Sequence, residues 1–380
     1  MFTLRQYLLA LEEPERLLRT LGDAVPCRRP DGRLQYSTGN SAAVFRILHR
    51  GRIRALRCYF RPMRRLAEIY GAGYLPREIY LHTSPGEGIW VDAAISDWIE
   101  GETLQEAVTA AAGRGDTQRL GRLSETFDRF AAELVADDRA HGDLKPENII
   151  VTADGSLRPI DFDAAFLPAF ARETSSEMGT AAYQHPARTA ADFDASLDDY
   201  PAALIATALH ALRRDPALLG RYAHRDGLLY TPGDIRRDEA LRETLALFER
   251  EGAAAEYRIA RLLLAPTLRL PGLHDLLLHA AGPGAAPETL PELYAENGLW
   301  GFRTPGRRVT PPLWECGFDF SDDLAAVRLG RTWHYIDPAG RTVLRCPQYE
   351  AVKPFRNGRA QVFRDGRRLT IDPRGNEFEF

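Results

Sequence analysis

The segment HGDLKPENII, residues 141–150, carries three side chains whose spacing suits phosphoryl transfer. Asp143 can accept a hydrogen bond from an incoming hydroxyl and orient it. Lys145 can neutralise charge on a γ-phosphate, and the amide oxygen of Asn148 is a ligand that Mg²⁺ accepts. We therefore predict that this segment is a loop at which ATP, Mg²⁺ and an acceptor hydroxyl meet.

A second metal-binding carboxylate is required near this loop. The apolar runs at residues 149–151 and 157–160 flank a turn sequence, and this pattern predicts a tight hairpin. Because a hairpin returns the chain to its starting point, Asp161 is expected beside Asn148. The two side chains can then share one Mg²⁺.

Helices and strands on both sides must hold this loop in place. Residues 118–136 have apolar side chains at helical spacing, so they predict an amphipathic helix that ends just before the loop. Residues 202–213 are apolar nearly all round, which is typical of a buried helix. Residues 36–60 predict two strands joined by a turn, and residues 89–99 predict a further strand.

Residues 291–380 have a different character, because helical spacing stops and an internal repeat begins. Related motifs start at Trp300 (WGFRTPGR), Trp333 (WHYIDPAGR) and Arg368 (RLTIDPRGN). The turn glycine of the first motif, Gly306, is followed by two others at intervals of about 35 residues. Each unit is expected to form short strands that stack on the next unit.

The bulk composition is that of an ordinary soluble globular protein, with 44% apolar and 27% charged residues. The formal net charge of −4 gives no reason to expect nucleic acid or an anionic membrane as a partner. The four cysteines lie far apart, which fits a reducing compartment. Neither a signal peptide nor an apolar run of about 18 residues is present, so we expect a cytoplasmic protein.

The segment HGDLKPENII followed by IDFD, residues 160–163, resembles the catalytic and metal-binding loops of the protein kinase superfamily. The form DLKPEN is similar to serine/threonine kinases, and the chain as a whole resembles bacterial, eukaryote-like protein kinases. The resemblance implies catalysis by Asp143 and Lys145 and metal binding by Asn148 and Asp161. It also implies ATP and Mg²⁺ as cofactors and a protein serine or threonine as the acceptor.

Two downstream segments continue the resemblance. The stretch GTAAYQHPAR, residues 179–188, looks like the end of an activation segment, and Thr180 is expected to hydrogen-bond the catalytic loop. The stretch LDDYP, residues 197–201, looks like the start of the buried helix of the family. Asp198 in this stretch is expected to bind the backbone of the catalytic loop.

Three upstream segments resemble the nucleotide-binding parts of the family. Residues 39–45 resemble a reduced glycine-rich loop, residues 55–58 the strand with the ATP-binding lysine, and residues 96–104 the hinge that meets adenine. The resemblance implies the following cofactor-binding residues: Gly39, Asn40, Ser41, Val44, Ala55, Arg57, Asp97, Trp98, Ile99 and Ile150.

The ATP-binding positions depart from the family pattern in two places. The residue matching the usual lysine is Arg57, which keeps the charge but is bulkier and forked. Its expected ion-pair partner, and so a member of the catalytic set, is Glu68, with Glu78 as the second choice. Ser37 and Ala42 stand where glycines are usual in the loop.

Two more departures lie near the catalytic loop. Gly142 stands where many regulated kinases have an arginine that meets an activation-loop phosphate, so we expect no requirement for that phosphate. Asp163 replaces a glycine and can add a carboxylate near the metal, whereas Ala187 replaces a structural glutamate. Since the four residues that carry the chemistry are all retained, we expect an active enzyme.

Two other functions stay open. Arg57 and the thinned glycine loop also suit a nucleotide-binding pseudokinase scaffold that presents its repeats to a partner. The triplet His-Gly-Asp resembles small-molecule kinases of the aminoglycoside phosphotransferase type. Lys145-Pro146 and the long segment between Asp161 and Pro186 argue against that third function.

The resemblance implies an α+β, bilobal protein-kinase-like fold, with a β-rich N-lobe and a helical C-lobe, followed by a small β-rich region that resembles WG repeats. These repeats either dock a protein substrate or partner, or form a structural cap. Buried tryptophans would favour the cap, and exposed ones docking. The expected segments are 1–35 (an extension packed on the N-lobe), 36–101 (N-lobe), 102–282 (C-lobe), 283–296 (linker) and 297–380 (WG-type repeats).

Overall fold

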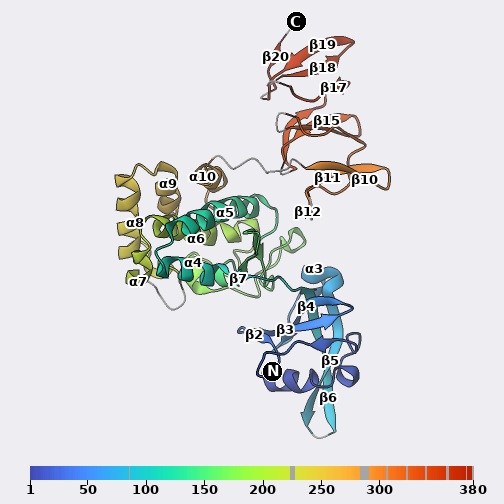
Figure 1. Ribbon diagram of the computed structural model, residues 1–380, viewed down its shortest axis with the longest axis vertical. Coiled ribbons are helices and arrows are strands. Elements are labelled where there is room, and N and C mark those ends of the chain that lie inside the picture. Colours follow the sequence, from blue (N-terminus) through green and yellow to red (C-terminus); the bar gives the residue numbers. More distant parts are fainter. Residues whose placement is uncertain are drawn as a thin grey trace. The chain divides into compact units, whose positions relative to one another are not determined.

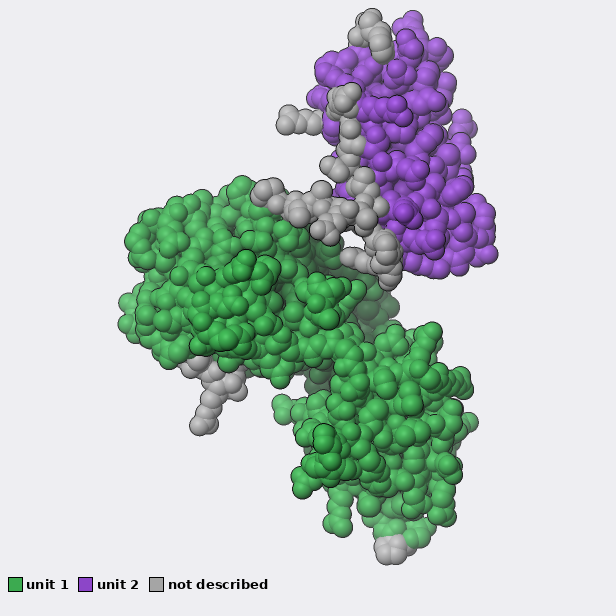
Figure 2. Space-filling view, viewed as in Figure 1, with its two compact units in different colours: residues 1–282 green, residues 283–380 purple. Residues whose placement is uncertain are grey.

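The chain forms two compact units, residues 1–282 and residues 283–380 (Figure 2). The first unit mixes helices and strands, and the described part of the second holds strands only. The architecture is therefore α+β with a β-rich C-terminal region, as predicted. The computed structural model describes residues 1–84, 86–222, 227–282, 291–304, 307–321, 324–338, 340–356, 359–373 and 375–378.

The first unit begins with a six-stranded sheet, coloured blue in Figure 1. Its strands are β1 (Val25–Pro26), β2 (Tyr36–Thr38), β3 (Ala42–His49), β4 (Arg52–Tyr59), β5 (Tyr74–Ser84) and β6 (Glu87–Asp97). The strand order is β1-β3-β4-β6-β5, and β2 also pairs with β3. Arg50 and Gly51 join β3 to β4 with φ angles of 48° and 74°, which suits the two-residue hairpin turn that the sequence predicted.

The N-terminal residues pack on this sheet. Helix α1 (Leu4–Ala10) begins after Thr3, whose side chain forms a capping box with Gln6. Tyr7 is completely buried, and its hydroxyl donates a hydrogen bond to the carbonyl oxygen of Tyr59 in β4. The apolar face of α1 and the inward side chains of the sheet thus share one core.

The rest of the first unit is mainly helical. Helix α5 (Thr117–Ala136) packs on α6 (Asp199–Arg214), and all of α6 except its last two residues is buried. These are the helices predicted at residues 118–136 and 202–213. The other helices are α2 (Pro14–Leu17), α3 (Leu66–Tyr70), α4 (Leu104–Gly113), α7 (Ala217–Tyr222), α8 (Glu239–Arg250), α9 (Ala254–Leu262) and α10 (Leu273–Ala280).

A three-stranded sheet links the helices to the predicted loop. It consists of β7 (Glu102–Thr103), β8 (Ile149–Val151) and β9 (Leu157–Pro159). Strands β8 and β9 form the antiparallel hairpin that the sequence predicted. Beyond its end, the N–H of Ile160 donates to the carbonyl oxygen of Asn148 over 2.9 Å. The hairpin therefore returns the chain to the loop that precedes it.

The described residues of the second unit form three antiparallel sheets, coloured orange to red in Figure 1. Successive strands are neighbours in each sheet, so every sheet is a simple meander. The strands are β10 (Glu292–Glu296), β11 (Leu299–Thr304), β12 (Arg307–Arg308), β13 (Cys316–Gly317), β14 (Ala325–Leu329), β15 (Thr332–Ile336), β16 (Thr342–Cys346), β17 (Ala351–Val352), β18 (Ala360–Arg364), β19 (Arg367–Ile371) and β20 (Glu377–Phe378).

The predicted linker over residues 283–296 is wrong at its C-terminal end. Residues 292–296 are strand β10, which pairs with β11 along its whole length. Tyr294 of this strand is buried, so β10 packs as part of the sheet. A five-residue strand after a Gly- and Pro-rich stretch carries too little alternation to be recognised from sequence. Residues 283–290 and the turn glycine Gly306 lie outside the described residues.

Two of the repeat tryptophans are buried. Trp314 and Trp333 expose 7% and 6% of their surface, and Trp300 is half-buried. Trp314 shares a small core with Phe302 of β11. The indole N–H of Trp333 donates over 3.2 Å to the carbonyl oxygen of Glu350, which directly precedes β17 of the next sheet. These contacts favour a structural role for the tryptophans themselves.

The first residue of α6 makes the stability of the first unit depend on pH. Burial raises the pKa of the Asp199 carboxyl to about 6, although its oxygen accepts a hydrogen bond from the N–H of Leu270 at 2.8 Å. Because the folded state holds this proton more tightly than the unfolded state, protonation of Asp199 adds to the unfolding free energy. This contribution is fully present below about pH 4 and is lost as the pH rises through about 6. We expect wild type to lose stability relative to Asp199→Asn across this window, measured by urea unfolding with hydrogen exchange of α6 peptides. A pH-independent difference would contradict this assignment.

Candidate functional site

The predicted catalytic loop is fixed by a buried carboxylate. Asp198, directly before α6, has no exposed surface and accepts hydrogen bonds from the backbone N–H groups of His141 at 2.6 Å and Gly142 at 3.0 Å. The prediction that Asp198 binds this backbone is confirmed. Burial raises the pKa of Asp198, and the two N–H donors act in the opposite direction. The start of the loop is therefore tied to the most buried helix of the unit.

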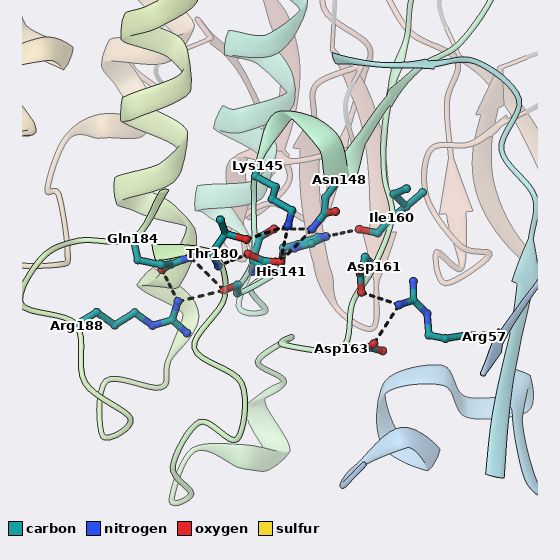
Figure 3. A network of polar contacts seen from close by, with 12 residues as sticks. Arg57, His141, Lys145, Asn148, Ile160, Asp161, Asp163, Thr180, Gln184 and Arg188 are labelled. Carbon is teal, nitrogen blue, oxygen red and sulfur yellow. Dashed lines mark hydrogen bonds and ion pairs between the residues drawn. The ribbon is translucent and has the colours of Figure 1, made fainter. Parts of the chain in front are cut away.

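His141 has a structural environment. One ring nitrogen, Nε2, lies 2.7 Å from the carbonyl oxygen of Ile160 (Figure 3). The ring also contacts that of Phe162, with centroids 5.0 Å apart. The imidazole thus joins the catalytic loop to the segment after β9, which contains Asp161.

Gly142 is required by the backbone. Its φ is 76°, and a Cβ atom at this position would stand 2.1 Å from the carbonyl oxygen of Ala164. An arginine before Asp143 would meet the same obstacle. Arg188 approaches this point from elsewhere, because its Nη1 donates to the carbonyl oxygen of Gly142 at 3.1 Å. Sequence reasoning missed Arg188, since no local pattern connects it to the loop.

The chemical groups of the loop converge on one carboxylate (Figure 3). Asp143 accepts a hydrogen bond at Oδ1 from the N–H of Thr180 at 2.6 Å and at Oδ2 from the side-chain amide of Asn148 at 3.2 Å. The ammonium of Lys145 donates to the Thr180 hydroxyl at 2.8 Å and lies 3.5 Å from Asp143 Oδ2. The prediction that Thr180 hydrogen-bonds the loop is confirmed. Two of the predicted chemical residues, Lys145 and Asn148, both contact a third, Asp143.

The amide of Asn148 is oriented by this network. Its nitrogen donates to both the carbonyl oxygen and the carboxylate of Asp143. Its oxygen has no hydrogen-bond partner among the described residues. The arrangement therefore presents an oxygen donor where the sequence predicted a metal ligand.

The fourth predicted residue, Asp161, follows the hairpin with a positive φ of 69°, a conformation that non-glycine residues rarely adopt. Its Oδ1 accepts a hydrogen bond from Nη1 of Arg57 at 2.8 Å. The same nitrogen of Arg57 also lies 3.0 Å from Oδ2 of Asp163. Strained backbone of this kind is common at functional sites, where surrounding contacts hold it in place.

The ion pair predicted between Arg57 and Glu68 does not form. Glu68 is exposed on α3, and the second choice, Glu78, is buried at another place. Glu78 accepts hydrogen bonds from the backbone N–H groups of Thr20 and Leu21, both at 2.9 Å, and so fixes the N-terminal segment. The partners of Arg57 are Asp161 and Asp163.

Asp163 has an environment unlike that of an ordinary surface carboxylate. Its Oδ1 accepts hydrogen bonds from the hydroxyl of Tyr59 at 3.1 Å and from that of Tyr70 at 2.7 Å. Burial raises the pKa of Asp163, and the Arg57 guanidinium acts in the opposite direction. A weak signal for this residue was present in the sequence, because an acid replaces the expected glycine.

The predicted nucleotide-binding residues occupy several elements. Gly39, Asn40 and Ser41 lie in the turn between β2 and β3. Val44 of β3 is opposite Arg57 of β4 in the sheet, and Ala55 lies two positions earlier on β4. Asp97, at the end of β6, pairs with Arg54 at 3.4 Å, and Trp98 and Ile99 follow it. Ile150 lies apart from this sheet, on β8. Their role in binding ATP stays a prediction.

A set of contacts that sequence reasoning missed joins the segment after β4 to the predicted activation segment. Arg65 forms an ion pair with Glu173 and donates to the carbonyl oxygen of Thr174 at 3.0 Å. Its guanidinium also stacks over the ring of Phe170 at 4.9 Å. Arg61 pairs with Glu177 over 2.5 Å. The cations of RPMRR, residues 61–65, are the signal that could have indicated this segment.

Comparison with known proteins identifies one family. Residues 335–367 match the model of the WG containing repeat, which confirms the predicted repeat type there. Among curated proteins, none matches the chain. Of the helices that the structure describes, none combines the length and apolar character needed to cross a membrane. In the same described residues, no group of three or more His, Cys, Asp or Glu side chains is placed to hold a metal ion.

Proposed function

We propose that residues 1–282 transfer the γ-phosphate of ATP to serine or threonine hydroxyls of a protein substrate. The observation that carries this proposal is the convergence of Asn148, Lys145 and Thr180 on the carboxylate of Asp143. A phosphoryl-transfer site needs such a fixed base for the hydroxyl, with a cation beside it. The resemblance of the surrounding sequence to serine/threonine kinases supports the choice of acceptor.

Each side chain has a distinct task in this mechanism. Asp143 is held by donors on both oxygens, so its position is set before the acceptor hydroxyl donates a hydrogen bond to it. Lys145, 3.5 Å from Asp143, neutralises charge on the transferred phosphoryl group. Arg57 is the cation that holds the other phosphates.

A magnesium site is supported by the amide oxygen of Asn148, which has no hydrogen-bond partner among the described residues. Asn148 and Asp161 would hold the ion, and both provide the oxygen ligands that Mg²⁺ prefers. Mg²⁺ usually completes its shell with waters and substrate phosphates, so a ready cage of protein carboxylates is not required. An ion held there would supply positive charge against the phosphates of ATP.

The first test is transfer of label from radiolabelled ATP with Mg²⁺ to the protein itself and to generic protein substrates. We expect Asp143→Asn to lower the rate by about 100- to 10,000-fold, because the base is lost. The control is Asp154→Asn, the same change in an exposed turn. Phosphoserine or phosphothreonine in the labelled product would exclude a small-molecule kinase. Equal labelling by wild type and Asp143→Asn would contradict the proposal.

One observation favours a second candidate function, a nucleotide-binding pseudokinase scaffold. The ion pair between Arg57 and Asp161 occupies the carboxylate that the metal needs. Nucleotide binding without transfer, in the same assay, would support this candidate. The WG repeats would then act as the functional part, by binding a protein partner. In the enzyme they are a docking or structural appendage.

A further inference from the structure

Arg57 needs an anion that holds it in place, and the structure offers two. Asp161 and Asp163 both contact its Nη1, at 2.8 and 3.0 Å. The side chain of Arg57 is 12% exposed, so its charge is largely removed from water and requires a partner. Which carboxylate serves this purpose decides how the site can work.

The two carboxylates differ in their surroundings. The side chain of Asp161 is 36% exposed, whereas that of Asp163 is 9% exposed. Asp163 also accepts hydrogen bonds from the hydroxyls of Tyr59 and Tyr70, at 3.1 and 2.7 Å. One oxygen of Asp163 therefore serves the tyrosines and the other serves Arg57. Asp161 has an exposed side that can turn to another cation.

We propose that Asp163 is the positioning residue for Arg57, the task that the sequence assigned to Glu68. Tyr59 belongs to β4, Tyr70 ends α3 and Asp163 follows the hairpin, so the contact joins three separate elements. Arg57 contacts both carboxylates, so it would keep Asp163 as a buried partner when Asp161 turned to hold the metal. The inference rests on the proposed function, because Arg57 matters here as the cation for the nucleotide phosphates.

A second feature strengthens this assignment. A buried charge pair is productive when the remaining donors and acceptors are also satisfied. Asp163 meets this condition with three hydrogen bonds from three side chains. Glu68 has no comparable environment, because it is exposed on α3. The glycine expected at position 163 could offer none of these contacts.

The test is binding of a non-hydrolysable ATP analogue with Mg²⁺ to the full chain, measured by calorimetry. We expect Asp163→Asn to weaken binding by about tenfold, because a charge-assisted hydrogen bond is lost. The matched control is Asp92→Asn, which changes a carboxylate on β6 that also accepts a hydrogen bond from a tyrosine, Tyr74 at 2.8 Å. We expect less than about a twofold change there.

A double-mutant cycle distinguishes positioning from a general structural effect. In the Arg57→Met background, Asp163→Asn should change binding by less than about twofold, because Asp163 acts through Arg57.

An equal loss in both backgrounds, or a larger effect of Glu68→Gln than of Asp163→Asn, would overturn the inference. If wild type binds the analogue and Asp163→Asn binds it equally well, this inference is overturned but the proposed function is not. Absence of binding by wild type would overturn the proposed function and this inference together. Binding without phosphate transfer leaves the inference intact.

Discussion

Replacing Gly142 by alanine is expected to lower the unfolding free energy of the first unit by about 3 to 5 kcal/mol. A Cβ atom at this position would stand 2.1 Å from the carbonyl oxygen of Ala164 and 2.9 Å from its carbonyl carbon. These are backbone atoms, which cannot swing aside as the end of a flexible side chain can. The φ of 76° adds strain for any residue with a Cβ. The loop therefore has to move away from its hydrogen bonds to Asp198.

The matched control is Gly155→Ala. Gly155 has a φ of 81°, but nothing lies within 4 Å of its added Cβ. Gly155→Ala should therefore lower the unfolding free energy only by the cost of a positive φ, about 1 kcal/mol. Urea unfolding with hydrogen exchange of α6 peptides measures both variants in the full chain. Equal losses at the two positions would show that the approach of Ala164 has no consequence. Gly142→Arg should lower the unfolding free energy at least as much as Gly142→Ala, because it adds the same Cβ atom.

The local features of the site were accessible from the sequence. Asp143, Lys145 and Asn148 lie within six residues, so their mutual distances are limited by the chain itself. The hairpin that follows was recognisable because turn residues separate two apolar runs. Asp198 and Thr180 were located by resemblance to a family, and their hydrogen bonds to the loop confirm both predictions.

The ion-pair partner of Arg57 could not be predicted from the sequence. Glu68, Glu78 and Asp163 are all acidic, and the sequence gives no distance between any of them and Arg57. The choice depends on packing between segments more than a hundred positions apart, as in the contact of Arg57 with Asp163. The hydroxyls of Tyr59 and Tyr70 decide it, and neither tyrosine belongs to a chemical motif. Family resemblance pointed to a glutamate on a helix, and this chain provides an aspartate on a loop.

In the C-terminal repeats, too, the sequence pattern was visible but the tertiary contacts were not. The repeat period was visible because it depends on residue identity at fixed intervals. The first strand, β10, was missed because its pairing with β11 is a tertiary fact that a Gly- and Pro-rich neighbourhood hides. Burial of Trp314 and Trp333 was also open, since an aromatic side chain serves equally well in a core or on a docking surface.

Replacing Asp198 by alanine is expected to lower the unfolding free energy by about 3 to 5 kcal/mol, because two buried N–H groups lose their acceptor. Asp198 has no exposed surface, and the N–H groups of His141 and Gly142 lie 2.6 and 3.0 Å from its oxygens. Water has no access that would replace the carboxylate. Because the same N–H groups begin the catalytic loop, we also expect phosphate transfer to fall with the loss of loop position.

The control for Asp198 is Asp238, which also accepts hydrogen bonds from two backbone N–H groups, those of Leu241 at 3.0 Å and Thr231 at 2.8 Å. Asp238 caps α8 and is only half-buried, so water can reach the groups it leaves. Asp238→Ala should therefore lose about 1 kcal/mol, the usual contribution of an N-cap. Hydrogen exchange in α6 and α8 peptides under urea compares the two variants within one chain. If the two losses were equal, burial of Asp198 would not be what fixes the loop, and the hydrogen bonds alone would account for its position.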